Sequence, residues 1–139
     1  MRSLQESSVI VRSLDEIIDS ERDVGGSGWK SRRLLLASDG MGFSLTDTII
    51  LKGASLTLEY KHHLEACYCI DGEGEITALS EGVTHKLKPF TVYALDHNDL
   101  HTVSAINGNM RLVCVFSPAL SGQEVHREDG SYAPADQNQ

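Results

Sequence analysis

Features that would place a protein in a membrane or on nucleic acid are missing from this sequence. No apolar run approaches the ~20 residues that a membrane-spanning helix needs. The N-terminal stretch MRSLQESSVIVRSLDE lacks the apolar core of a signal peptide. The formal net charge of -8 argues against a nucleic acid or an anionic membrane surface as partner. We therefore expect a cytoplasmic protein that binds neither.

Cysteine is scarce and its number is odd. Cys67, Cys69 and Cys114 all lie in apolar, strand-like patterns. Because Cys67 and Cys69 alternate with Tyr68, we expect both on one face of a strand. This arrangement indicates buried, reduced thiols rather than a disulfide framework. A CxC metal site is the alternative, but burial is the commoner fate of such cysteines.

Length and composition predict one ordinary globular domain. A chain of 139 residues buries roughly 65–70% of its unfolded surface on folding, which is enough for a sizeable core. Hydrophobic residues make up 40% and charged residues 23% of the sequence, as in typical soluble domains. We expect residues 1–8 to be a flexible extension, residues 9–132 a single domain and residues 133–139 a disordered tail.

Short apolar runs separated by glycine, asparagine or aspartate turns fill most of the chain. We predict strands over 9–11, 33–36, 43–51, 55–60, 66–70, 73–79, 85–87, 92–95, 101–105 and 110–116. Asp71-Gly72 and Asn107-Gly108 are predicted to be hairpin turns, and residues 19–28 a flexible loop. Ser13 and Glu16 form a capping-box pattern that opens a short helix. The pattern is typical of an all-β sandwich or barrel with one or two short helices.

Residues 53–74, GASLTLEYKHHLEACYCIDGEG, hold the richest group of candidate metal ligands and bases. Within this strand–turn–strand pattern lie Glu59, His62, His63 and Glu65. By chemistry alone, the two histidines are the better ligands. We rank them lower because we expect the turn to point at least one of them outward.

The same stretch carries the spacing of the first cupin motif, G-x5-HxH-x3-E-x6-G. Gly53, Glu65 and Gly72 match it, whereas Glu59 and Lys61 stand where the two histidines belong. Longer segments then resemble, in order, the ectoine synthase family of cupins: WKSRRLLLASDGMGFS, YKHHLEACYCIDGEGE, VYALDHNDLH, MRLVCVF and GQEVHREDGSY. The resemblance covers roughly residues 9–132. It implies an all-β cupin barrel, also called a double-stranded β-helix, with a pocket inside, and a homodimer.

The resemblance also implies a hydro-lyase that makes a compatible solute under osmotic stress. In that reaction the α-amino group of N4-acetyl-L-2,4-diaminobutyrate attacks the acetyl amide carbon of the same molecule, and loss of water leaves ectoine. It further implies Fe(2+), held by Glu65, Tyr93 and His101. A Lewis acid polarises an otherwise poor amide electrophile. A set of glutamate, tyrosine and histidine suits a hard-to-borderline cation and leaves coordination positions open.

Candidate acid–base residues follow from the protonated α-amino group, which must lose a proton before it attacks. The resemblance implies Tyr60, Glu124 and His126 for this task. Our hypothesis is that Glu124 holds the ammonium and that Tyr60 or His126 moves protons. Glu124 and His126 are two residues apart in a strand-like segment, so their side chains share a face.

Arg33 is the candidate for the substrate carboxylate, because a guanidinium can bind a carboxylate through two parallel hydrogen bonds. Its neighbour Arg32 should point to the other face of the strand. Thr46 and Thr48 alternate on one strand face and can both hydrogen-bond the substrate.

Trp29 and Phe116 are expected to form apolar walls that exclude water, and Cys114 lies in a matching wall position. Exclusion of water matters because the reaction expels water and can run backwards as hydrolysis.

Two other functions are compatible with the sequence. One is another metal-dependent cupin enzyme, such as a dioxygenase or isomerase, which the missing HxH pair disfavours. The other is a cupin that binds a small solute without turning it over, which would not need metal ligands and acid–base groups in one cavity. The ligand candidates also have ordinary alternatives: Glu65 as a salt-bridged strand residue, His101 as a turn residue, and Tyr93 as a core residue with a satisfied hydroxyl.

Overall fold

The computed structural model describes residues 8–122. Glu124 and His126 lie outside the described residues. The elements are helix α1 (Leu14–Ile17), strands β1 (Asp23–Gly26) and β2 (Trp29–Leu35), the 3-10 turn η1 (Ala37–Asp39), and strands β3 (Ser44–Ile50), β4 (Ser55–Leu58), β5 (Leu64–Ala78), β6 (Val83–Leu87), β7 (Val92–Leu95) and β8 (His101–Ser117). The prediction of an all-β fold with little helix is confirmed. None of the helices in this part of the chain is long and apolar enough to cross a membrane.

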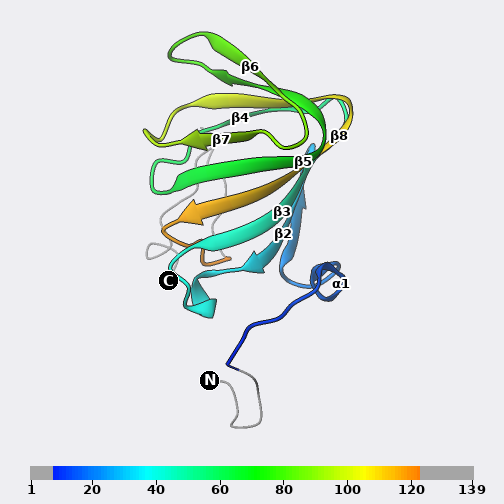
Figure 1. Ribbon diagram of the computed structural model, residues 1–139, viewed down its shortest axis with the longest axis vertical. Coiled ribbons are helices and arrows are strands. Elements are labelled where there is room, and N and C mark those ends of the chain that lie inside the picture. Colours follow the sequence, from blue (N-terminus) through cyan, green and yellow to red (C-terminus); the bar gives the residue numbers. More distant parts are fainter. Residues whose placement is uncertain (1–7, 123–139) are drawn as a thin grey trace.

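The strands form one antiparallel, eight-stranded sheet in the order β1-β2-β3-β8-β5-β6, with β4 paired to β8 and β7 paired to β5 (Figure 1). The long strands β5 and β8 run through the whole arrangement and pair with each other along most of their length. Their pairing is interrupted by register shifts between Cys69 and Glu73. These shifts divide the molecule into two halves.

The first half, here called the site half, pairs residues 64–69 of β5 with residues 112–117 of β8. It continues through β3 and β2 on one side and β7 on the other. The second half, here called the support half, pairs residues 73–78 of β5 with residues 101–106 of β8 and adds β4 and β6. Each half therefore contains one end of both long strands.

The predicted hairpin turns at Asp71-Gly72 and Asn107-Gly108 are wrong, because both segments lie inside continuous strands. Gly72 and Asn107 do adopt positive φ, at 81° and 66°. A Cβ at Gly72 would stand 2.2 Å from the Asn109 carbonyl oxygen, so only glycine permits the close approach of the strands here. The turn signals mark bulges at which the paired strands bend together.

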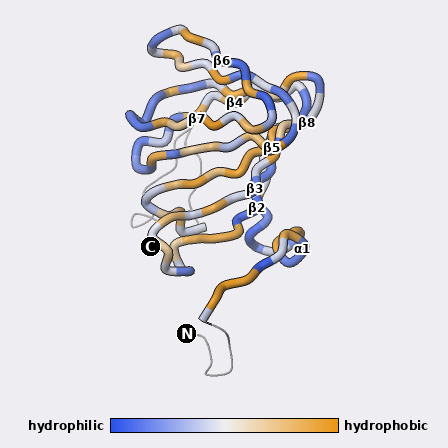
Figure 2. The backbone as a smooth tube through the Cα atoms, viewed as in Figure 1, coloured by the Kyte–Doolittle hydropathy of each residue, from blue (hydrophilic) through white to orange (hydrophobic). Residues whose placement is uncertain are grey.

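The N-terminal predictions also need correction. Residues 9–11 lie outside the sheet, and Val9 and Val11 are 63% and 83% exposed, which Figure 2 shows as a hydrophobic stretch leading to α1. The predicted 19–28 loop contains β1, which pairs with the start of β2. Ser13 precedes α1, yet its side chain makes no capping hydrogen bond. Apolar character alone therefore did not decide strand formation, since a strand needs a partner with matching register.

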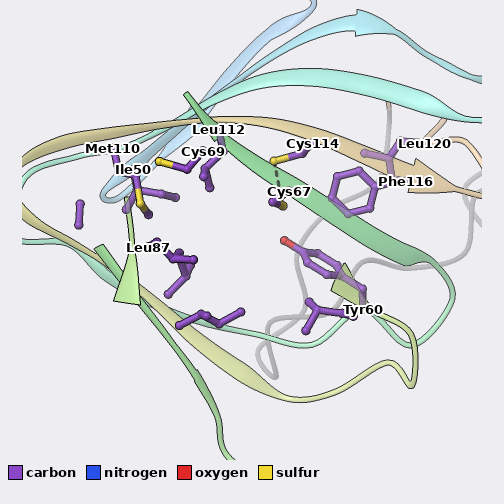
Figure 3. Packing of buried hydrophobic residues seen from close by; sticks show 14 of the residues in the cluster. Ile50, Tyr60, Cys67, Cys69, Leu87, Met110, Leu112, Cys114, Phe116 and Leu120 are labelled. Atoms are coloured by element: carbon purple, nitrogen blue, oxygen red, sulfur yellow. Dashed lines mark hydrogen bonds between the residues drawn. The ribbon is translucent and has the colours of Figure 1, made fainter. Parts of the chain in front are cut away.

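The core fills the space between the two halves, because alternate side chains of β5 and β8 point inward (Figure 3). Its buried members include Cys67, Cys69, Ile76, Leu87, Val103, Ala105, Met110, Leu112, Cys114 and Phe116. All three cysteines are buried and free, as the sequence predicted. The core continues directly into the walls of a pocket.

Asp47 on β3 ties the site half together from its outer face. Arg32 Nη2 lies 2.8 Å from Asp47 Oδ1, and Arg111 Nε on β8 lies 3.0 Å from the same oxygen. Burial alone would raise the pKa of Asp47, but the hydrogen bonds from Arg111 and Arg32 outweigh it and hold the pKa below its usual value. Since Arg32 binds Asp47, its neighbour Arg33 is left for the opposite face.

Candidate active site

The pocket opens inside the barrel and is lined from both halves. Its lining residues are Trp29, Ser31, Thr48, Ile50, Leu56, Leu58, Tyr60, Glu65, Cys67, Tyr93, Val103, Leu112, Cys114 and Phe116. Most of these side chains are apolar, and Glu65 is the ionisable carboxylic acid among them. A cavity of this kind excludes water and leaves a few polar groups to orient a small ligand.

Strand register places the candidate residues in adjacent rows. One row crosses five strands, from Arg33 on β2 through Thr46, Cys114 and Cys67 to Tyr93 on β7. The adjacent row on the same face runs from Ser44 through Phe116 to Glu65. Residues far apart in sequence are therefore neighbours because of the pairing of β3, β8, β5 and β7.

Glu65 on the site half and His101 on the support half face each other. Glu65 Oε1 lies 3.9 Å from His101 Nε2, and both atoms are buried. Neither atom has a hydrogen-bond partner among residues 8–122. A buried hydrogen-bond acceptor without a partner lowers the stability of the fold, so this pair of facing atoms requires a chemical explanation.

The protonation states of the two residues supply that explanation. His101 Nδ1 lies 3.0 Å from the Asp99 carbonyl oxygen, which only accepts, so Nδ1 carries the proton and Nε2 presents its lone pair. Burial lowers the pKa of His101, which opposes an imidazolium–carboxylate pair. Burial raises the pKa of Glu65 to about 7, partly offset by a hydrogen bond from Cys67. Two lone-pair donors facing each other in a buried site are suited to a shared cation.

Tyr93 completes the group. It lies directly opposite Cys67 across β5 and β7, and its ring centre is 6.4 Å from that of His101. Burial, reinforced by the neighbouring Cys67 and Glu65, holds the pKa of its phenol well above the usual value. A nearby divalent cation acts in the opposite direction and favours phenolate. Of the three residues predicted as metal ligands, Glu65 and His101 therefore face each other, and the ring of Tyr93 lies beside that of His101.

Tyr60 lies beside this group and is 5% exposed. Its ring packs edge-on against Phe116 at 5.1 Å and lies 6.0 Å from the His101 ring. The Asn98 side chain holds the Tyr60 segment by donating to the carbonyls of Tyr60 and His63, at 2.7 and 3.0 Å.

The predicted substrate-binding residues occupy two positions relative to the pocket. Trp29, Thr48, Cys114 and Phe116 line it. The indole of Trp29 lies so close to Gly26 that a Cβ there would stand 2.7 Å from the indole nitrogen. This contact explains the glycine at position 26 of β1, where composition alone suggested a loop.

Arg33 and Thr46 are buried behind the lining. Thr46 Oγ1 is 3.0 Å from Thr48 Oγ1, which confirms that the two threonines share a face. Arg33 is 2% exposed; its Nη1 donates to the Gly122 carbonyl at 3.1 Å, and its Nε has no partner among the described residues. A buried guanidinium with a spare donor is suited to an anionic group.

Cys67 lines the pocket, although it was not among the site residues predicted from the sequence. It stands two positions after Glu65 on one strand, so alternation alone places both on the same face. Of the two histidines ranked below the other ligands, His62 is exposed and His63 is buried with Nδ1 2.8 Å from the Pro118 carbonyl. The expectation that one of them points outward is confirmed.

Comparisons with known proteins agree with this geometry. The family model described as ectoine synthase matches residues 9–136. An L-ectoine synthase of Desulfatibacillum aliphaticivorans is 52% identical over 130 residues, covering 92% of this chain and 99% of the relative. The crystal structure of an ectoine synthase from P. lautus is 50% identical, with a TM-score of 0.82 and coverage of 88% of this chain and 87% of that one.

More distant structures share the fold alone. The cupin domain of Cnp3 from Schizosaccharomyces pombe is 17% identical with a TM-score of 0.56, and the likeness covers 67% of this chain and 66% of that one. The predicted cupin barrel is therefore confirmed.

Proposed function

The chain belongs to the ectoine synthase family of hydro-lyases, and from this premise we propose that its pocket closes N4-acetyl-L-2,4-diaminobutyrate into ectoine with iron held by Glu65, Tyr93 and His101. The proposed iron site is supported mainly by the facing, buried atoms Glu65 Oε1 and His101 Nε2, which lie 3.9 Å apart. Ferrous iron, when bound there, supplies a Lewis acid for the acetyl carbonyl.

The chain's own residues then have separate tasks. Arg33 binds the substrate carboxylate through its guanidinium; its support is the spare Nε donor, which lies behind the pocket lining. Thr48 in the lining binds a polar atom of the substrate, and Thr46 behind it contributes through the hydroxyl contact between the two threonines. These contacts fix one end of the molecule, so that the α-amino nitrogen and the acetyl carbon meet as an intramolecular pair.

Proton transfer belongs to the Tyr60 side of the pocket. Glu124 holds the substrate ammonium, and Tyr60 or His126 takes its proton before attack and returns protons to the departing oxygen as water forms. Tyr60 is supported in this role by its position in the lining near His101.

Trp29, Cys114 and Phe116 form the wall that keeps bulk water away. Because the product amidine can be hydrolysed, the apolar wall favours the forward reaction by limiting access of a second water molecule.

The experiment is a turnover assay on the full chain. Substrate is incubated with protein and ferrous iron under anaerobic conditions, with a chelator-treated sample alongside, and ectoine is measured by chromatography. We expect ectoine in the iron-loaded sample only. Equal turnover after chelation would overturn the metal assignment, and tight ectoine binding without turnover would overturn the catalytic function.

We further propose a homodimer in the cytoplasm. Three free, buried thiols are compatible with a reducing compartment. Tyr68, Phe90 and Val92 are 42%, 75% and 61% exposed on the outer side of β5 and beside β7, and a second copy of the chain would cover them. Light scattering should show Tyr68→Lys shifted toward monomer. Val83→Lys, at an exposed apolar position on β6, is the matched control.

A further inference from the structure

The mechanism proposed above uses neither of two thiols in the pocket wall as a metal ligand. Cys67 on β5 and Cys114 on β8 are directly opposite in the strand register, and their sulfurs lie 3.1 Å apart without a disulfide bond (Figure 3). Both side chains line the pocket and both are buried. One oxygen of Glu65 joins them, so that all three ligand atoms lie within 4.8 Å of one another.

Packing alone does not account for this group. Cys69, two residues further along β5, is equally buried, but its sulfur donates to the backbone carbonyls of Asp71 and Gly72 at 3.5 and 3.7 Å. Cys67 instead contacts Cys114, Glu65 and Tyr93, all of which carry side-chain donor atoms. Cys67 and Cys69 therefore provide a matched pair, one within a ligand cluster and one in ordinary surroundings.

The size of the cluster suits a small tetrahedral cation. Zinc binds thiolate sulfur at about 2.3 Å and carboxylate oxygen at about 2.1 Å, so two thiolates on one ion stand roughly 3.8 Å apart. Reaching this spacing from 3.1 Å requires a small rotation of two side chains. A fourth position would face the pocket, since all three residues line it.

We propose that Glu65, Cys67 and Cys114 form a second metal site, specific for thiophilic divalent cations of the zinc and cadmium class. Sulfur ligands select such ions, whereas the set of Glu65, Tyr93 and His101 has no sulfur and selects harder ones. Because Glu65 belongs to both sets, a thiophilic ion removes a ligand from the other set and acts as an inhibitor. This last consequence rests on the proposed function, and the site itself does not.

The test titrates cadmium into the metal-free full chain and records the ultraviolet charge-transfer band of a cadmium–thiolate bond. We expect one cadmium per chain to produce the band, and Cys67→Ser and Cys114→Ser to abolish it. Cys69→Ser should keep it. The exposed group of Asp96, His97 and Asp99 has no sulfur, so an ion bound there gives no such band.

A second measurement needs no variant. X-ray absorption of the cadmium-loaded wild-type chain should show two sulfur ligands. Oxygen and nitrogen ligands alone, or a band that survives both serine substitutions in chains that melt at the wild-type temperature, would overturn the site. A full cadmium band together with undiminished ectoine formation would instead overturn the shared use of Glu65, while leaving the turnover assay of the iron-loaded chain as the separate test of function.

Discussion

The two ends of strand β5 have the same strand pairing but different buried side chains. Both ends pair with β8 in antiparallel register. In the site half the inward residues of β5 are Glu65, Cys67 and Cys69, while in the support half Gly74 and Ile76 take the equivalent buried positions. Along β5 itself, the site end buries the ionisable Glu65, whereas the support end buries the apolar Ile76. Function and stability are therefore separated along a single strand.

The largest effect should come from removing the shared carboxylate. Glu65→Gln keeps the shape of the side chain but not its charge, so turnover should fall by about 10³-fold, or about 4 kcal/mol of transition-state stabilisation. Iron content measured after dialysis should fall with it. Glu73→Gln, on the support end of the same strand and exposed, is the control and should retain activity. Equal activity of the two variants would refute the division.

The support half should govern stability. Ile76→Ala removes a side chain that is 6% exposed and leaves a cavity, which should lower the free energy of unfolding by about 3–4 kcal/mol. Turnover per folded molecule should stay the same, because Ile76 does not line the pocket. Urea denaturation gives the first quantity and an assay normalised to folded protein gives the second. A stable but inactive variant would contradict the assignment.

The pH dependence of stability should depend on Glu65. Burial raises the folded pKa of Glu65 from 4.5 to about 7, so its stabilising contribution is complete below about pH 4.5 and is lost as the pH rises through 7. Metal-free wild type should therefore lose about 3 kcal/mol relative to Glu65→Gln between these pH values. Denaturation at several pH values with chelator present measures the difference. Parallel curves for the two proteins would contradict the pKa assignment.

The smallest effect concerns the turn that carries Tyr60. Asn98→Asp loses the amide donor to the carbonyls of Tyr60 and His63, which should cost about 1–2 kcal/mol of stability. Turnover should fall more than substrate affinity, because Tyr60 is displaced while the carboxylate site is unaltered. Kinetics of Asn98→Asp beside His97→Asn, an exposed neighbour in the same turn, separate the two effects.

Alternation within strands was the most reliable signal in the sequence. It placed Thr46 with Thr48 and Cys67 with Cys69 on shared faces, because side-chain direction in a strand is a local property. The same rule places Cys67 on the same face as Glu65, so both line the pocket. Cys67 was nevertheless interpreted from the sequence as an ordinary buried thiol and not as a pocket residue.

Which strands pair with each other could not be predicted from turn and strand patterns in the local sequence. Asp71-Gly72 and Asn107-Gly108 are sequences that favour a positive φ. A positive φ occurs in a β-bulge as well as in a hairpin turn. Which one forms depends on whether β5 and β8 pair on both sides of the bend. In the same way, 9–11 is apolar but lies outside the sheet, whereas the glycine-rich β1 forms because β2 lies beside it.

His101 is a site residue that could not be predicted from the local sequence. Sequence chemistry favoured His62 and His63, and only the family resemblance favoured His101. The fold explains the difference, since β8 brings His101 Nε2 to within 3.9 Å of Glu65 Oε1, while His62 is exposed.

The proposed function requires one cation that is shared by residues from both halves of the barrel. Crystals of the full chain grown with ferrous iron, measured on both sides of the iron absorption edge, test it most directly. We predict an anomalous peak within about 2.5 Å of the Glu65 carboxylate, the Tyr93 phenol oxygen and His101 Nε2. A peak held elsewhere, with these three groups apart and sharing no ion, would contradict it.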